Sequence, residues 1–141
     1  MKKILFDANV VLDVLLDRKP HAEASAAVWV AVETGIAEGM LAAHAVTAIH
    51  YLVQKEMGAV KARKIVSAIL KVFAVAPVDD AVVQEALQLP LSDFEDAVTA
   101  AAARQSVCEC IVTRDPKGFR GSPVRALTPE ALVPLLTATR P

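Results

Sequence analysis

Three carboxylates gather at Asp93, Glu95 and Asp96, where an apolar helical segment is predicted to begin. Ser92 and Glu95 have the spacing of a capping box, which would give both a structural task. Asp93 and Asp96 would then lie on one face of the helix, close to the end where its dipole favours negative charge. They either complement that dipole or belong to a shared acidic site.

Two further acids follow segments that read as buried strands. Asp7 comes directly after the apolar run 2–6, and Asp115 follows the run 110–113. In an open parallel sheet, ligands bind beyond the carboxyl ends of the strands, where the strand order reverses. If these two strands are neighbours, Asp7, Asp115 and the start of the central helix converge. This placement predicts at least three carboxylates at one edge, with either Asp96 or Asp93 completing the group.

Carboxylates crowded in this way raise one another's pKa unless a cation compensates them. Mg²⁺ or Mn²⁺ prefers such oxygen ligands and usually keeps several waters. A metal of this kind can lower the pKa of a bound water and orient it at a phosphodiester. Asn9 and Thr113 could add amide or hydroxyl contacts, and Arg114 is placed to contact a phosphate.

Short apolar runs alternate along the chain with segments of helical periodicity, joined by short links. This order predicts an α/β fold, a three-layer domain over residues 1–141 with a central parallel sheet of four to five strands and helices on both faces. The predicted strands are 2–6, 40–43, 73–76, 110–113 and 124–127, and the predicted helices are 10–16, 21–34, 46–55, 59–72, 79–87, a central helix ending near 105, and a last one from 128.

The net charge of −1 gives the molecule no basic field to attract nucleic acid. The densest basic group, from Lys61 to Lys71, reads as a solvated helix face. No apolar run approaches the roughly 18 residues of a membrane span. The first apolar run meets Asp7 too early for a signal peptide, so we expect a cytoplasmic protein.

Several other polar residues read as structural. Asp13 is expected to be solvated or to cap a helix, and His50 to be half-buried in an apolar helix. The remaining histidines, His44 among them, carry no functional signal. Cys108 and Cys110 alternate in a predicted strand and should therefore point to one buried face.

Three stretches together resemble a PIN domain of the kind found as the toxin of bacterial toxin–antitoxin pairs. They are Phe6–Asp13, Asp93–Val98 and the segment Ile111–Asp115 with Phe119. The resemblance implies a Mg²⁺- or Mn²⁺-dependent endoribonuclease, an antitoxin partner and a homodimer. It also implies Asp7, Asp96 and Asp115 as catalytic metal ligands, with Asp93 as a fourth candidate.

The sequence departs from that family at two positions. PIN domains commonly carry a glutamate near the place of Ile49, whereas no acid occurs here between Glu38 and Glu56. A further acid often precedes the late Phe, and Gly118 stands there instead. A PIN-like module that binds RNA or protein, with weak or no nuclease activity, is therefore the alternative.

Other aspartate-using α/β enzymes fit less well. Phosphatases of the haloacid dehalogenase type need a second Asp where Asn9 stands. Receiver domains need an acidic pair after the first strand and an acceptor Asp after the third, where Pro77 and Asp79 occur.

Overall fold

The computed structural model describes residues 2–138, and within that range five parallel strands form one sheet. The strand order is β3-β2-β1-β4-β5. The first and fourth strands are therefore neighbours, which is the condition under which Asp7 and Asp115 were expected to converge. The strands are β1 (Lys2–Phe6), β2 (Ala37–Ala42), β3 (Ala74–Ala76), β4 (Cys110–Val112) and β5 (Ala126–Leu127).

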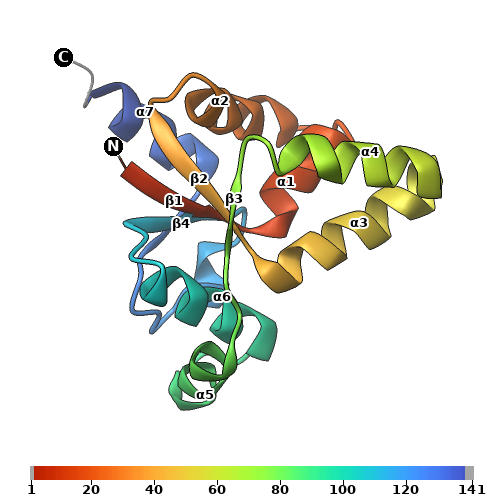
Figure 1. Cartoon of the computed structure of the whole chain (residues 1–141). Coiled ribbons are helices and arrows are strands. Elements are labelled where there is room, and N and C mark those ends of the chain that lie inside the picture. Colours follow the sequence, from red (N-terminus) through yellow and green to blue (C-terminus); the bar gives the residue numbers. More distant parts are fainter. Residues whose placement is uncertain (1, 139–141) are drawn as a thin grey trace.

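Helices cover both faces of this sheet, which confirms the predicted α/β architecture (Figure 1). One face carries α1 (Ala8–Leu15), α2 (Ala22–Glu33), α3 (Ala43–Met57), α4 (Ala59–Ile69) and α7 (Pro129–Ala138). The opposite face carries α5 (Asp80–Gln88) and α6 (Phe94–Gln105), and a 3₁₀ turn, η1 (Pro116–Phe119), follows β4.

The central strand β1 contributes side chains to the hydrophobic layers on both faces of the sheet, because successive side chains of a strand point to opposite faces. Ile4 and Phe6 are buried with the helices of the first face, and Leu5 is buried with α5 and α6. The two cysteines divide in the same way, Cys110 facing the first layer and Cys108 the second. The expectation that they share a face is wrong, because β4 begins only at Cys110.

Helix α6 is buried along the whole run Ala97–Ala103, since its small side chains let it lie close between the sheet and α5. The helix begins at Phe94, and its N-cap is Asp93, whose carboxylate accepts a hydrogen bond from the Asp96 amide at 3.0 Å. The predicted capping box of Ser92 and Glu95 is therefore wrong. Asp93 takes the capping position, where an acid is equally favoured.

Some predicted boundaries also shift. Strand β2 starts at Ala37 rather than Met40, because its pairing with β1 already begins at Lys2. Helix α3 begins directly after β2, three residues before the predicted Val46. Strand β5 is limited to Ala126–Leu127, which pairs with the end of β4. Residues 139–141, included in the predicted domain, lie outside the described range, as does residue 1.

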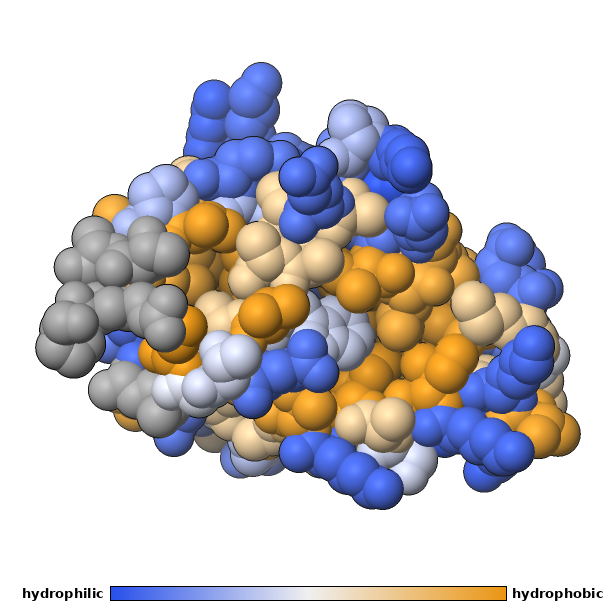
Figure 2. All heavy atoms as spheres, turned by 90° about the horizontal axis from the view of Figure 1, so that it is seen from above, coloured by the Kyte–Doolittle hydropathy of each residue, from blue (hydrophilic) through white to orange (hydrophobic). Residues whose placement is uncertain are grey.

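The surface above α2, α4 and α7 carries apolar areas separated by hydrophilic side chains (Figure 2). Val30 on α2 and Val60 on α4 are at least half exposed. None of the helices in the described range is both long and apolar enough to cross a membrane.

Candidate metal centre

The carboxyl ends of β1 and β4 lie side by side and place the first two acids. Phe6 is paired with Val112, and the amide of Asp7 donates to the Val112 carbonyl at 2.9 Å. The chain then turns into α1 after Asp7 and into η1 after Asp115. Both acids therefore leave the sheet at the same edge, as their positions after two neighbouring strands predicted.

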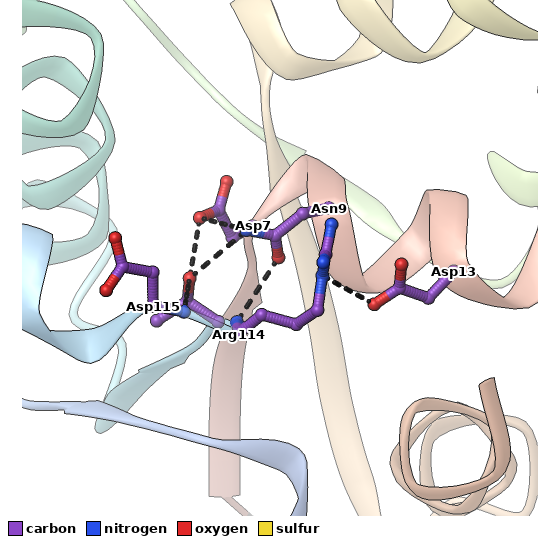
Figure 3. Close-up of polar contacts among 6 residues, drawn as sticks. Asp7, Asn9, Asp13, Arg114 and Asp115 are labelled. Carbon is purple, nitrogen blue, oxygen red and sulfur yellow. Dashed lines mark hydrogen bonds and ion pairs between the residues drawn. The ribbon is translucent and has the colours of Figure 1, made fainter. Parts of the chain in front are cut away.

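A hydrogen-bond network ties these two strand ends together (Figure 3). The Thr113 hydroxyl donates to Oδ2 of Asp7 at 2.8 Å and accepts from the Asp115 amide at 3.2 Å. The Asn9 amide group lies 3.4 Å from the same Asp7 oxygen, and Asn9 Oδ1 lies 3.4 Å from the backbone nitrogen of Arg114. Asn9 and Thr113 thus fix Asp7 against the segment that carries Asp115.

Burial is the main reason why the pKa of Asp7 lies above its ordinary value, and the hydrogen bond from Thr113 works in the opposite direction. The charge of Glu95 raises this pKa further, and His44 lowers it. Side chains from α6 and from the start of α3 therefore act on Asp7 together.

Asp96 reaches the same region from the first turn of α6. Its pKa is raised to about 6, first by burial and then by the charges of Asp7, Asp93, Glu95 and Asp115. A Cβ atom at Gly118 would lie 2.9 Å from Oδ2 of Asp96 and 3.7 Å from Oδ2 of Asp115. These two carboxylates thus face one point in front of Gly118, where a glycine leaves room.

Asp93 lies next to this group in a different role. One of its oxygens accepts the Asp96 amide as the cap of α6, and the side chain is exposed. As a cap it holds the helix end that carries Asp96.

Asp13 is fully buried, which contradicts the expectation of a solvated or capping acid. The short helix α1 packs against α2 and α3, and its turn that carries Asp13 faces inward. Nε of Arg114 is 2.9 Å from Oδ2 of Asp13 (Figure 3). The two side chains form an ion pair by distance. They do not form an aligned hydrogen bond, since neither Asp13 oxygen has a hydrogen-bond partner within the described residues. Burial raises the pKa of Asp13, and Arg114 opposes that rise.

Sequence reasoning missed His44 and Glu95. His44 stands in the first turn of α3, directly after β2, and its Nε2 lies 3.2 Å from the Thr99 hydroxyl on α6. The rule that selected Asp7, a polar residue just beyond the end of a central strand, would also have selected His44. Glu95 was assigned to a capping box that does not form, and its side chain is exposed beside Asp96.

The donor types of the site fit a hard divalent cation, because several carboxylates crowd together with little cationic compensation. As they stand, no three His, Cys, Asp and Glu side chains of the described range are arranged to hold a metal ion. Asp7, Asp96 and Asp115 would have to move closer to one another to bind a metal ion.

Comparison with protein families decides the classification. The model of the family described as PIN domain matches residues 3–117. The chain belongs to the PIN-domain family. PIN domains are typically nucleases and generally bind divalent metals. The match spans all the acids of the site, from Asp7 to Asp115. A sequence search of curated proteins found no match.

Several solved structures share this fold. FitAcB from Neisseria gonorrhoeae has a TM-score of 0.71 at 24% identity, covering 90% of this chain and 98% of that one. VapBC2 from Rickettsia felis, bound to a DNA fragment from its promoter, has a TM-score of 0.70 at 10% identity, covering 89% and 98%. VapBC-1 from nontypeable Haemophilus influenzae has a TM-score of 0.66 at 8% identity, covering 91% and 98%.

Proposed function

We propose that this PIN-domain protein is a metal-dependent endoribonuclease that hydrolyses RNA phosphodiester bonds. Its catalytic carboxylates are Asp7, Asp96 and Asp115. The observation that carries the proposal is the convergence of carboxylates from three separate stretches: Thr113 links Asp7 to Asp115, and Asp96 and Asp115 face one point in front of Gly118. Burial and the mutual repulsion of these acids raise the pKa of Asp96. Such mutual repulsion lowers stability, so it is typical of a site built to receive a cation.

Asp7, Asp96 and Asp115 would hold Mg²⁺ or Mn²⁺. A bound cation of this type supplies a water of lowered pKa and stabilises the charge that develops on the phosphate. Thr113 and Asn9 keep Asp7 oriented at the strand end. Arg114 is committed through Nε to Asp13, and we place its partly exposed side chain against a substrate phosphate.

Cleavage of a mixed-sequence single-stranded RNA tests this function, with Mn²⁺, with Mg²⁺ or with EDTA present. The wild type should cut with metal and not with EDTA, and Asp115→Asn should not cut. Asp17→Asn is the matched control, because Asp17 is exposed and Asn tolerates its positive φ of 48°. Metal-independent cutting, or full activity of Asp115→Asn, would contradict the proposal.

We place the protein as the toxin of a toxin–antitoxin pair, acting in the cytoplasm as a homodimer. Structural neighbours occur in such complexes. The exposed apolar side chains above α2 and α4 offer a surface for a protein partner. Light scattering on the purified chain gives the oligomeric state, and only a mass of twice 15.0 kDa supports the dimer.

A second function, a PIN-like module that binds RNA or protein without cutting it, is favoured by one observation. Ile49, near the place where the family commonly has a glutamate, is buried in the core, so α3 brings no carboxylate to the site. Gly118 stands where the family often has a further acid, so this position also brings no carboxylate to the space in front of Asp96 and Asp115.

Gly118→Asp separates the two functions. The new carboxylate would enter the space in front of Asp96 and Asp115, with Gly118→Asn as the uncharged control of equal size. If the wild type does not cut RNA only because one acid is missing, Gly118→Asp should cut RNA and Gly118→Asn should not. Strong wild-type cleavage with Mn²⁺ would rule the module out.

A further inference from the structure

His44 is a group of the site that the carboxylate arrangement does not use. It lies two residues beyond the end of β2, the strand next to β1, so its helix turn adjoins the strand end that carries Asp7. Its ring is held against α6 by the contact between Nε2 and the hydroxyl of Thr99 at 3.2 Å. An imidazolium at this position would lower the pKa of Asp7. His44 therefore lies near the end of β1 that carries Asp7, on the side of β1 opposite β4.

The hydrogen bonds of Thr99 favour one tautomer of His44. The Thr99 hydroxyl has one hydrogen, and it lies 3.0 Å from the carbonyl of Glu95, one helical turn earlier. If that hydrogen is donated to the carbonyl, the hydroxyl can only accept from His44. Nε2 is then the protonated nitrogen, and Nδ1 of the neutral ring keeps a free lone pair.

Nδ1 is also the atom left without a partner. It is buried and makes no hydrogen bond to any described residue. A buried acceptor in that condition costs free energy comparable to a lost hydrogen bond. A ligating histidine commonly donates its other ring N–H to a neighbouring oxygen, and in this tautomer Nε2 would donate to Thr99 in the same way.

We propose that Nδ1 of His44 is a nitrogen ligand of the divalent cation held by Asp7, Asp96 and Asp115. This inference rests on the proposed function and adds a donor on α3, the helix that brings no carboxylate. Thr99 is a positioning residue that sets the tautomer and the orientation of the ring. Mg²⁺ is a hard cation that takes oxygen ligands, so a nitrogen ligand should shift the preference of the site away from Mg²⁺ and toward the transition metal Mn²⁺.

Electron spin-echo measurements on the intact chain with Mn²⁺ test the ligation directly. The wild type should show modulation from a bound ¹⁴N nucleus, which changes when the histidines are labelled with ¹⁵N. The chain has three histidines. His50→Phe is the matched control, because His50 lies on the same helix and should leave the signal unchanged. His44→Phe should remove the signal.

Mn²⁺ and Mg²⁺ titrations by calorimetry give a second readout. His44→Phe removes the proposed ligand and should weaken Mn²⁺ binding by more than about tenfold, the lower end of the range for outer-shell partners, and Mg²⁺ binding by less. Thr99→Val keeps the shape of the buried side chain and removes the acceptor for Nε2. It should also weaken Mn²⁺ binding by about tenfold while the nitrogen signal persists in weakened form.

Failure of this inference differs from failure of the nuclease proposal. If Mn²⁺ binds and depends on Asp115 but shows no nitrogen modulation, His44 is not a ligand and the nuclease proposal stands. If the signal persists in His44→Phe, the nitrogen comes from elsewhere and the inference is overturned. If the wild type binds no Mn²⁺ at all, both proposals fail. The wild-type spectrum needs no variant to fold.

Discussion

Two groups of carboxylates lie on either side of the β1–β4 strand ends, and they differ in whether a cation of the chain compensates their negative charge. Asp13 is fully buried and meets the guanidinium of Arg114 at 2.9 Å. Asp96 is partly buried, and the charges that act most on it all come from other acids. The chain therefore compensates the structural acid with its own cation and leaves the other carboxylates for a cation from solution.

The same segment serves both groups. Arg114 pairs with Asp13 of α1. Its neighbours Thr113 and Asp115 belong to the hydrogen-bond network around Asp7. Anchoring Arg114 in the core therefore holds the turn that presents Asp115. This coupling means that damage to the buried pair should disturb the carboxylate group, while damage to the carboxylate group should leave the pair intact.

The largest effect should follow Asp7→Asn. This change keeps an acceptor for the Thr113 hydroxyl and removes one charge from the group. We expect the rate of metal-dependent RNA cleavage to fall at least about 10³-fold, equivalent to several kcal/mol of lost transition-state stabilisation, with the fold retained. Single-turnover cleavage with Mn²⁺ and circular dichroism measure the two quantities. A change of less than tenfold would remove Asp7 from the catalytic group.

Arg114→Ala should have the next largest effect, because it leaves Asp13 buried without its cation. We expect a loss of about 3 kcal/mol in the free energy of unfolding, measured with urea. Asp13→Ala should cost less, because the side chain of Arg114 is 31% exposed and can turn to water. Equal losses for the two variants would contradict this account of the pair.

Asp96→Asn should raise stability while it abolishes cleavage. Folded Asp96 keeps its proton up to a pH of about 6, whereas an unfolded aspartate loses it near 3.8. The folded chain therefore binds more protons between these values, and metal-free stability falls as the pH rises from about 4 to about 6.

Urea unfolding in EDTA at pH 4 and pH 7 measures this contribution. At pH 7 the Asn variant should gain roughly 1–2 kcal/mol after allowance for solvent screening, and its pH dependence should flatten. Asp17→Asn is again the control and should leave both quantities unchanged. A destabilised Asp96→Asn at pH 7 would show that burial and the neighbouring acids do not disfavour the charged form of Asp96.

The smallest effect should separate capping from metal binding at Asp93. Asp93→Ala should lose about 1 kcal/mol of unfolding free energy, because the Asp96 amide loses its acceptor. Asp93→Asn keeps the cap, so it should restore stability. If Asp93 only caps the helix, Mn²⁺ affinity should survive in the Asn variant. A large loss of affinity there would make Asp93 a ligand.

The amino-acid sequence by itself determined the sheet, the helices and which acids lie at its edge. Apolar runs alternating with helical periods require a parallel sheet, and an acid directly after a strand must emerge at that strand's carboxyl end. The shared edge of Asp7 and Asp115 therefore follows from their positions along the chain. The family follows as well, because three acidic motifs occur in a fixed order.

Only the tertiary structure decided which polar groups face one another. Asp13 lies in the same helical stretch as Asp7, yet packing turns it inward to meet a guanidinium 101 positions away. His44 meets Thr99 across two elements, and no local pattern marks that contact. Asp93 caps the helix in place of Ser92, because the helix begins one residue later than a capping box at Ser92 requires. Charge compensation depends on distances through space, which periodicity along the chain does not contain.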